Sequence, residues 1–142
     1  MISLYRRLVE RISIWVAKKR GVDLGAQGEQ IACMWLERRG YRILDRNVKA
    51  PMGEADVIAE APGGTIVLVE VKTRVVDPAK PQPRAEDQVG SGKKKKLLAL
   101  MQHVSKANGW QQRKKRIDVV AIDVPKTGTE PKIKHIIDAV RG

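Results

Sequence analysis

Hydrophobic residues recur at helical spacing in three segments of the chain. Residues 2–19, about 25–39 and about 93–107 each carry an apolar stripe with a period near 3.6 residues. Gly40 marks the end of the second segment. The pattern predicts three helices. For the first we favour a helix that packs on the core, and the alternative is a basic segment that lies on a membrane or docks a partner.

Shorter apolar runs with strand character fill the rest of the chain. They cover residues 41–49, 53–60, 66–74 and 116–124, and residues 132–140 form a fifth strand or a terminal segment. The first three runs follow one another closely, which predicts an antiparallel meander. Residues 77–92 hold three prolines and two glycines and predict a long loop of the functional or mobile kind. The sum is an α/β fold with a central mixed sheet of four to five strands flanked by helices.

Length and composition suit a globular protein with a single core. Of the 142 residues, 42% are hydrophobic and 31% charged. We expect a helical extension at 1–24 followed by one domain at 25–142. The single cysteine, Cys33, excludes an internal disulfide and a cysteine-based zinc site, and its place on an apolar stripe predicts core packing. No apolar run reaches the roughly 18 residues of a membrane span, and the N-terminus has no secretory signal, so we expect a cytoplasmic protein without stable membrane insertion.

The charge of the chain points to a polyanionic partner. Lys and Arg number 28 against 16 Asp and Glu, a net charge of +12, which favours nucleic acid or an anionic membrane surface. Residues 93–116 hold nine Lys or Arg and no acid, whereas a merely solvated surface usually mixes both signs. Trp110 in this stretch either stacks on an unpaired base or packs in the core. The candidate nucleic-acid-binding residues are Lys93, Lys94, Lys95, Lys96, Arg113, Lys114 and Lys115.

The run IVLVEVKTR, residues 66–74, places an acid and a base at the end of an apolar strand. Because side chains alternate along a strand, Glu70 and Lys72 share one side. Glu54 and Asp56 are also two residues apart, and the tight turn between the two runs can bring this acidic pair beside them. Glu29, on the preceding helix, can lean over the same edge of the sheet.

A group of carboxylates without His or Cys suits a hard cation such as Mg²⁺, or Mn²⁺ in its place. Lys72 beside the ion can offset negative charge in a transition state, so the set suits phosphodiester hydrolysis. The alternative is a cross-strand salt bridge at a strand end. We favour the metal site, because converging acids repel one another and a purely structural role rarely explains that cost. His103 and His135 have no metal-ligand partner at suitable spacing, which predicts packing or surface positions.

These residues also match a known motif. Asp56 followed by Glu70-Val71-Lys72 resembles the PD-(D/E)xK nuclease motif, with Ala55 in place of the proline. More closely, GAQGEQIACMWLERRGYRILDRNVKAPMGEADVIA together with IVLVEVKTR resembles the YraN family, small bacterial proteins of uncertain function. The resemblance continues through RIDVVAIDV and HIIDAV and covers about residues 25–140.

The resemblance implies a restriction-endonuclease-like three-layer fold similar to that of archaeal Holliday-junction resolvases. It makes Glu29 the acid on the helix, Asp56 and Glu70 metal ligands and Lys72 the catalytic lysine, while Glu54 belongs to the family's Gly-Glu-x-Asp motif. With Glu54 added, Asp56 and Glu70 form the candidate metal set. The predicted function is a metal-dependent endonuclease acting on structured DNA, and the alternative is a non-catalytic nucleic-acid-binding accessory protein. A homodimer follows from the family analogy alone.

Overall fold

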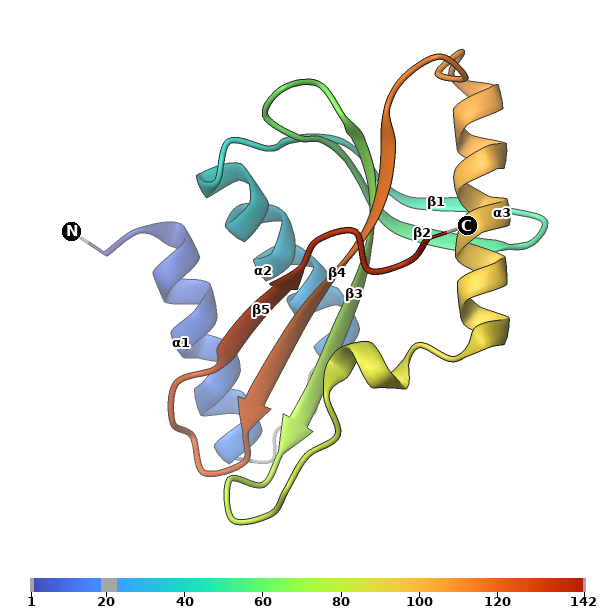
Figure 1. Ribbon diagram of the computed structural model, residues 1–142. Helices are drawn as coiled ribbons and strands as arrows, with labels where there is room; N and C mark the ends of the chain where they lie inside the picture. Colours follow the sequence, from blue (N-terminus) through green and yellow to red (C-terminus); the bar gives the residue numbers. More distant parts are fainter. Residues whose placement is uncertain (1, 19–22, 142) are drawn as a thin grey trace.

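The computed structural model describes residues 2–18 and 23–141, and Figure 1 shows their helices and strands. The helices are α1 (Leu4–Ala17), α2 (Leu24–Arg38), the short 3-10 helix η1 (Ala85–Gln88) and α3 (Ser91–Ala107). The strands are β1 (Arg42–Ala50), β2 (Gly53–Glu60), β3 (Ile66–Val76), β4 (Lys115–Pro125) and β5 (Lys132–Ile136). Every predicted helix and strand is present, and η1 is an addition inside the predicted loop.

The five strands form one mixed sheet in the order β1-β2-β3-β4-β5. β1, β2 and β3 pair antiparallel, which confirms the predicted meander. β3 and β4 are parallel, because the chain returns through the long loop and α3 before it enters β4. β5 pairs antiparallel with β4 and closes the sheet on that side. The predicted α/β class with a central mixed sheet is therefore confirmed.

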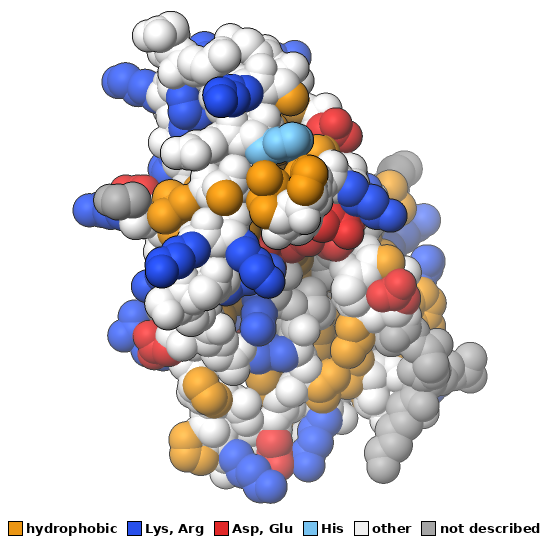
Figure 2. All heavy atoms as spheres, turned by 90° about the vertical axis from the view of Figure 1, so that its right-hand side faces the viewer, with side chains coloured by type: hydrophobic (Ala, Val, Ile, Leu, Met, Phe, Trp, Pro, Cys, Tyr) orange, Lys and Arg blue, Asp and Glu red, His pale blue; other side chains and the backbone are white. Residues whose placement is uncertain are grey.

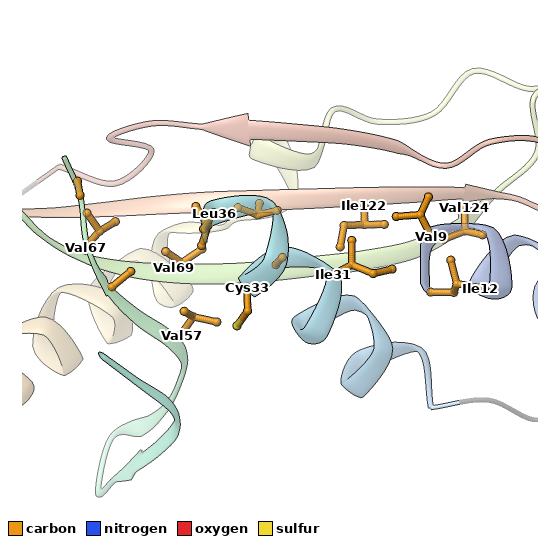
Figure 3. Packing of buried hydrophobic residues seen from close by; sticks show 14 residues of the cluster. Val9, Ile12, Ile31, Cys33, Leu36, Val57, Val67, Val69, Ile122 and Val124 are labelled. Atoms are coloured by element: carbon orange, nitrogen blue, oxygen red, sulfur yellow. The ribbon is translucent and has the colours of Figure 1, made fainter. Parts of the chain in front are cut away.

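Helices cover both faces of the sheet and make three layers (Figure 1). α1 and α2 pack on one face, where a hydrophobic cluster joins them to β2, β3 and β4 (Figure 3). α3 packs on the other face over a second cluster. Strand alternation divides β3 between the two: Val67 and Val69 belong to the α2 side, and Ile66 and Leu68 belong to the α3 side. Cys33 is buried in the α2 cluster, as its apolar stripe predicts.

Two boundaries differ from the sequence-based expectation. α2 begins at Leu24, one residue before the expected start, and Asp23 caps the helix by accepting from the amide of Ala26 at 3.0 Å. β5 ends at Ile136. The chain then turns through Asp138, whose positive φ of 56° cannot continue a strand.

α1 packs on the core, and Leu8 and Ile12 of its predicted apolar stripe contact the hydrophobic cluster on the α2 side. Val9 and Ile12 are buried against α2 and β4, whereas Leu4 is 68% exposed. Lys19, at the end of the predicted segment, lies outside the described residues. The boundary at residue 24 between an extension and a domain stays a prediction. Among the described helices, none combines the length and the apolar character that crossing a bilayer needs.

Candidate active site

The predicted carboxylates lie where the sheet forks. The β2–β3 ladder runs from Glu60↔Ile66 to Val57↔Val69 and ends there. Beyond that point β2 stays paired with β1, and β3 stays paired with β4. Asp56 and Glu70 are the first residues past the ladder, one on each branch of the fork.

The side chain of Asp56 bonds to β3 just past the point where the backbone ladder between β2 and β3 ends. Its Oδ2 accepts a hydrogen bond from the amide of Val71 at 2.8 Å, which fixes the carboxylate next to β3. Burial raises the pKa of Asp56 above its usual value, although the Val71 amide and the charge of Lys93 act in the opposite direction. The carboxylate is thus held in a place that disfavours its charge unless a cation is present.

Glu70 has one paired and one unpaired carboxylate oxygen. Oε1 lies 3.2 Å from the Nζ of Lys93, in the first turn of α3, and the Glu70 side chain is only 14% exposed. Oε2 is buried, and no hydrogen-bond partner for it occurs among the described residues. Burial raises the pKa of Glu70, the charge of Asp56 raises it further, and Lys93 and Lys72 oppose these effects. A buried acceptor without a donor is costly, and a cation at this point would relieve that cost.

The two other predicted acids are joined by Asn47, which the sequence reasoning missed. With its amide nitrogen turned toward them, the orientation that pairs donors with acceptors, Asn47 donates to Glu54 Oε1 and to Glu29 Oε2, each at 3.0 Å. Burial raises the pKa of Glu29, and the nearby charge of Asp56 adds to it. Asn47 has a φ of 51°, a left-handed conformation in which Asn is enriched.

The residues present fit a magnesium or manganese ion at the fork. Asp56 and Glu70 are hard oxygen donors, and Mg²⁺ is commonly bound by one or two protein carboxylates. The unpartnered Oε2 of Glu70 is the observation that favours a cation there. Within residues 2–18 and 23–141, no three His, Cys, Asp or Glu side chains are grouped as a metal site would require. Glu54 accepts a hydrogen bond from Asn47, and its place in the predicted metal set with Asp56 and Glu70 stays a prediction.

Lys72 is on the side of β3 that carries Glu70, as strand alternation predicts. It is half-buried, and its charge lowers the pKa of Glu70 less than that of Lys93 does. The charges of two lysines, one on β3 and one on α3, therefore both lower the pKa of the Glu70 carboxyl group. Lys93 is one of the predicted nucleic-acid-binding residues, and its contact with Glu70 is a feature that the sequence does not predict.

A close contact between α2 and β3 sets the position of Glu29. A Cβ atom on Gly28 would lie 1.8 Å from Oγ1 of Thr73, so only glycine allows the helix to come this near. Gly28 precedes Glu29, and Thr73 follows Lys72. The contact thus places the helix acid beside the strand that carries Glu70 and Lys72.

The predicted basic residues form two groups along α3. Lys93 to Lys96 lie in the first turns of this helix, which has 17 residues and is about 25 Å long, and Arg113 to Lys115 lie past its other end. Arg113 is held by Glu60 at 2.8 Å and by the carbonyl of Gly64 at 2.7 Å. Lys115 donates to three backbone carbonyls of the turn before β4. Lys94, Lys95, Lys96 and Lys114 are exposed to solvent.

Figure 2 shows the face of the molecule that carries α3. Acidic side chains gather near its middle, and Lys and Arg side chains lie around them. Trp110 is partly buried and packs against the cluster beneath α3, which favours the core role over stacking on a base.

A second buried polar group was missed from the sequence. Asp118 on β4 is fully buried and accepts hydrogen bonds from Arg116 at 2.8 and 2.9 Å, from His135 Nε2 at 2.8 Å and from the amide of Asp138 at 2.9 Å. Burial alone would raise the pKa of Asp118, but these bonds outweigh it and hold the pKa below its usual value. The network ties the last residues of the chain to β4. The acid inside the apolar run RIDVVAIDV was the signal.

The chain matches the model of a protein family over residues 28–122, and this family is described as the uncharacterised protein family UPF0102. A UPF0102 protein of Anaeromyxobacter dehalogenans is 34% identical over 119 residues, which cover 84% of each chain. A UPF0102 protein of Thermodesulfovibrio yellowstonii is 37% identical, over 83% of this chain and 96% of that one. A UPF0102 protein of Geobacter metallireducens is also 37% identical, over 82% and 91%.

A solved structure of SfsA from Pyrococcus furiosus in complex with Ca²⁺ matches with 17% sequence identity and a TM-score of 0.37. The match covers 84% of this chain and 64% of that chain.

Proposed function

The chain belongs to the uncharacterised protein family UPF0102, and we propose that it is a metal-dependent nuclease that hydrolyses phosphodiester bonds in nucleic acid. The observation that carries the proposal is the pair of buried carboxylates at the fork, Asp56 and Glu70, with the unpartnered Oε2 of Glu70. Burial is the largest cause that raises the pKa of both acids, so the site disfavours their charged forms, and a bound cation would favour those forms.

In this proposal each side chain has a distinct task. Asp56 and Glu70 hold Mg²⁺, or Mn²⁺ in its place. When bound, such an ion supplies Lewis-acid polarisation of a phosphate oxygen. Lys72 and Lys93 bring positive charge to a largely buried place, where charge acts more strongly than in water on a developing oxyanion. Glu29, oriented by Asn47, borders the same site.

The substrate proposed is structured DNA, such as a branched or flapped duplex. We propose recognition of DNA structure instead of base sequence because none of the basic segments has the pattern of a base-reading helix. The family likeness adds the proposal of a homodimer, which would suit a four-way junction. The structured-DNA substrate and the homodimer are more specific proposals than the metal site, and both depend on it.

A second candidate function is a nucleic-acid-binding accessory protein that does not cleave. It is favoured by the salt bridge from Lys93 to Glu70, which supplies part of the positive charge that a metal would otherwise supply. It is also favoured by the position of Glu54, which bonds to Asn47 and leaves two carboxylates for an ion.

The experiment is a cleavage assay with end-labelled linear duplex, single-stranded, flap and four-way-junction DNA, with RNA strands in parallel. Mg²⁺ or Mn²⁺ is added, and Asp56→Asn serves as the control because it keeps an acceptor for the Val71 amide. Cleavage that requires metal and is lost in the variant supports the nuclease and identifies its substrate. Salt-sensitive binding without cleavage of any substrate supports the accessory protein instead.

A further inference from the structure

The outward side of α1 carries apolar side chains that the core does not cover. In the described part of the chain five large hydrophobic residues are exposed to solvent, and three of them belong to α1 or to the segment just before it. They are Ile2, Leu4 and Ile14, which are 52%, 68% and 50% exposed. Leu8 and Trp15 of the same helix are partly exposed. Apolar side chains gathered on one element in this way indicate an interaction surface.

The same side of α1 is basic. At about 100° per residue, Arg7, Arg11 and Lys18 fall within about 40° of one another around the helix axis. Leu4 and Ile14 flank this basic line, about 40° to either side of its centre. All five side chains are exposed to solvent, and we call them the α1 outer surface.

The acid of α1 lies away from the α1 outer surface and is paired. Glu10 is about 80° from the centre of the basic line and bonds to Arg6 at 3.2 Å, and Arg6 also bonds to Glu130. The guanidinium of Arg11 lies over an aromatic ring, that of Trp15, at 5.7 Å from its centroid. The α1 outer surface thus has three basic residues and no acidic one, a charge complementary to an anionic surface.

The exposed leucine and isoleucine favour a lipid bilayer over a nucleic acid as the partner. A nucleic-acid strand is bound through phosphate contacts and base stacking, to which aliphatic side chains add little. An anionic bilayer accepts both kinds of side chain, because aliphatic groups enter the boundary below the headgroups while Lys and Arg meet the acidic headgroups. Leu4 and Ile14 are about 15 Å apart along the axis, so a helix lying flat on the bilayer brings both to one depth.

We infer that the α1 outer surface holds the protein on an anionic membrane surface, with the helix axis parallel to the bilayer. The association is peripheral and reversible, because Val9 and Ile12 on the other side of α1 are packed in the core and only the outer side chains meet the lipid. Figure 1 shows α1 and α3 at opposite sides of the molecule. The α3 side, where Lys93 contacts Glu70, therefore stays free while α1 is on the membrane.

The test is co-sedimentation of the full-length protein with vesicles in EDTA and without nucleic acid. One set of vesicles is pure phosphatidylcholine, and the other contains equal parts of phosphatidylcholine and phosphatidylglycerol. We expect binding to the second set only, and weaker binding as the salt concentration rises, because the attraction to the acidic headgroups is screened.

Two double variants examine the two components of the α1 outer surface. Arg7→Gln with Arg11→Gln removes two charges and should weaken binding about 30-fold. Leu4→Gln with Ile14→Gln removes the aliphatic groups and should weaken it about tenfold. Thermal unfolding checks that each variant folds.

Matched controls place the same changes elsewhere on the surface. Lys80→Gln with Lys106→Gln removes two charges of exposed residues outside α1, and Val75→Gln with Ile137→Gln changes the two other exposed hydrophobic residues. Both should bind the vesicles within about twofold of the wild type.

Three results would overturn the inference. They are a wild type that sediments with neither set of vesicles, equal binding to both sets, and losses in the controls as large as those in the α1 variants. If the wild type ignores the vesicles and Arg7→Gln with Arg11→Gln weakens binding to DNA, the partner of this surface is nucleic acid and the membrane inference fails. The vesicle assay needs neither metal nor nucleic acid, so its result leaves the proposed nuclease to be judged by the cleavage assay alone.

Discussion

The ammonium group of Lys93 lies 3.2 Å from Oε1 of Glu70, so the first turn of α3 reaches into the carboxylate pair at the fork of the sheet. Lys93 also lowers the pKa of Asp56 through its charge. A single ammonium group thus acts on both proposed metal ligands and competes with a metal ion for the same negative charge.

Replacing this lysine should strengthen metal binding. In Lys93→Met the competing charge is gone, and Mn²⁺ is expected to bind about tenfold more tightly in the absence of nucleic acid. Calorimetric titration of the free protein with Mn²⁺ measures this. Lys94→Met is the matched control, because Lys94 is the exposed neighbour on the same helix and should leave affinity unchanged. Weaker binding in Lys93→Met would show that the lysine does not compete with the ion.

Removing the charge of Glu70 should stabilise the metal-free protein at neutral pH. Burial and the charge of Asp56 raise the pKa of Glu70 in the folded state, whereas in the unfolded chain it is about 4.3. Between these two values the folded state binds more protons, so wild-type stability falls as pH rises through this window and is flat above it. Glu70→Gln has no carboxyl group that titrates at this position, so its stability does not fall in this pH window. Its Tm should exceed that of the wild type at pH 7.5 by a few °C, equivalent to about 1 kcal/mol.

The measurement is thermal unfolding in EDTA from pH 4 to pH 8. The Tm difference between Glu70→Gln and the wild type should shrink as pH falls through the raised pKa. A difference that is constant over the whole range would mean that the titration of Glu70 is not its cause.

Two substitutions of Asp56 should separate its structural contact from its charge. Asp56→Asn keeps an oxygen that accepts from the Val71 amide, whereas Asp56→Ala leaves that amide without its partner. The alanine variant should therefore unfold about 3–8 °C lower than the asparagine variant, from a loss of about 1–2 kcal/mol. Both should lose metal binding, measured by titration with Mn²⁺. Equal Tm values would show that the amide bond contributes nothing to stability.

The close approach of α2 to β3 should make Gly28→Ala destabilising. The new methyl group meets Oγ1 of Thr73, and the overpacking is expected to cost about 1–3 kcal/mol in urea unfolding. Gly25→Ala in the same helix is the matched control, because its Cβ would meet only Asp23 at 3.4 Å. That variant should be neutral or slightly stabilising.

A double variant identifies the contact itself. Adding Thr73→Ala to Gly28→Ala removes Oγ1 and Cγ2 and should recover part of the lost stability, although the Cβ of residue 73 stays at 2.9 Å. If the two changes destabilise additively, the loss in Gly28→Ala has another origin.

The order of helices and strands was predictable from the sequence because hydrophobic periodicity follows local geometry. The meeting of Asp56 and Glu70 was predictable for a related reason: a short turn fixes the register of a hairpin, and the register fixes which side chains are neighbours. The split of the basic stretch also follows from a local fact, the length of α3, since a helix of 17 residues separates its ends by about 25 Å.

Other contacts depend on distances that no local pattern encodes. Lys93 reaches Glu70 only because the long loop after β3 returns α3 to that point. The bond between His135 and Asp118 depends on the β4–β5 register, in which Val120 is paired with His135, and the sequence reasoning therefore treated the histidine as isolated. The bonds from Asn47 to Glu54 and Glu29 could not be predicted, because they depend on a left-handed residue inside β1.

The fork in the sheet has a mechanical consequence. Asp56 belongs to the β1–β2 hairpin and Glu70 to the β3–β4 pair, and the ladder that joins β2 to β3 has four residue pairs. The fork therefore places one carboxylate on the hairpin and the other on the parallel pair. Met52, at the tip of the hairpin, packs against the hydrophobic cluster beneath α3, and Lys93 of α3 contacts Glu70. The same helix therefore holds the hairpin that carries Asp56 and reaches the carboxylate on the parallel pair, so its position bears on the separation of the two proposed metal ligands.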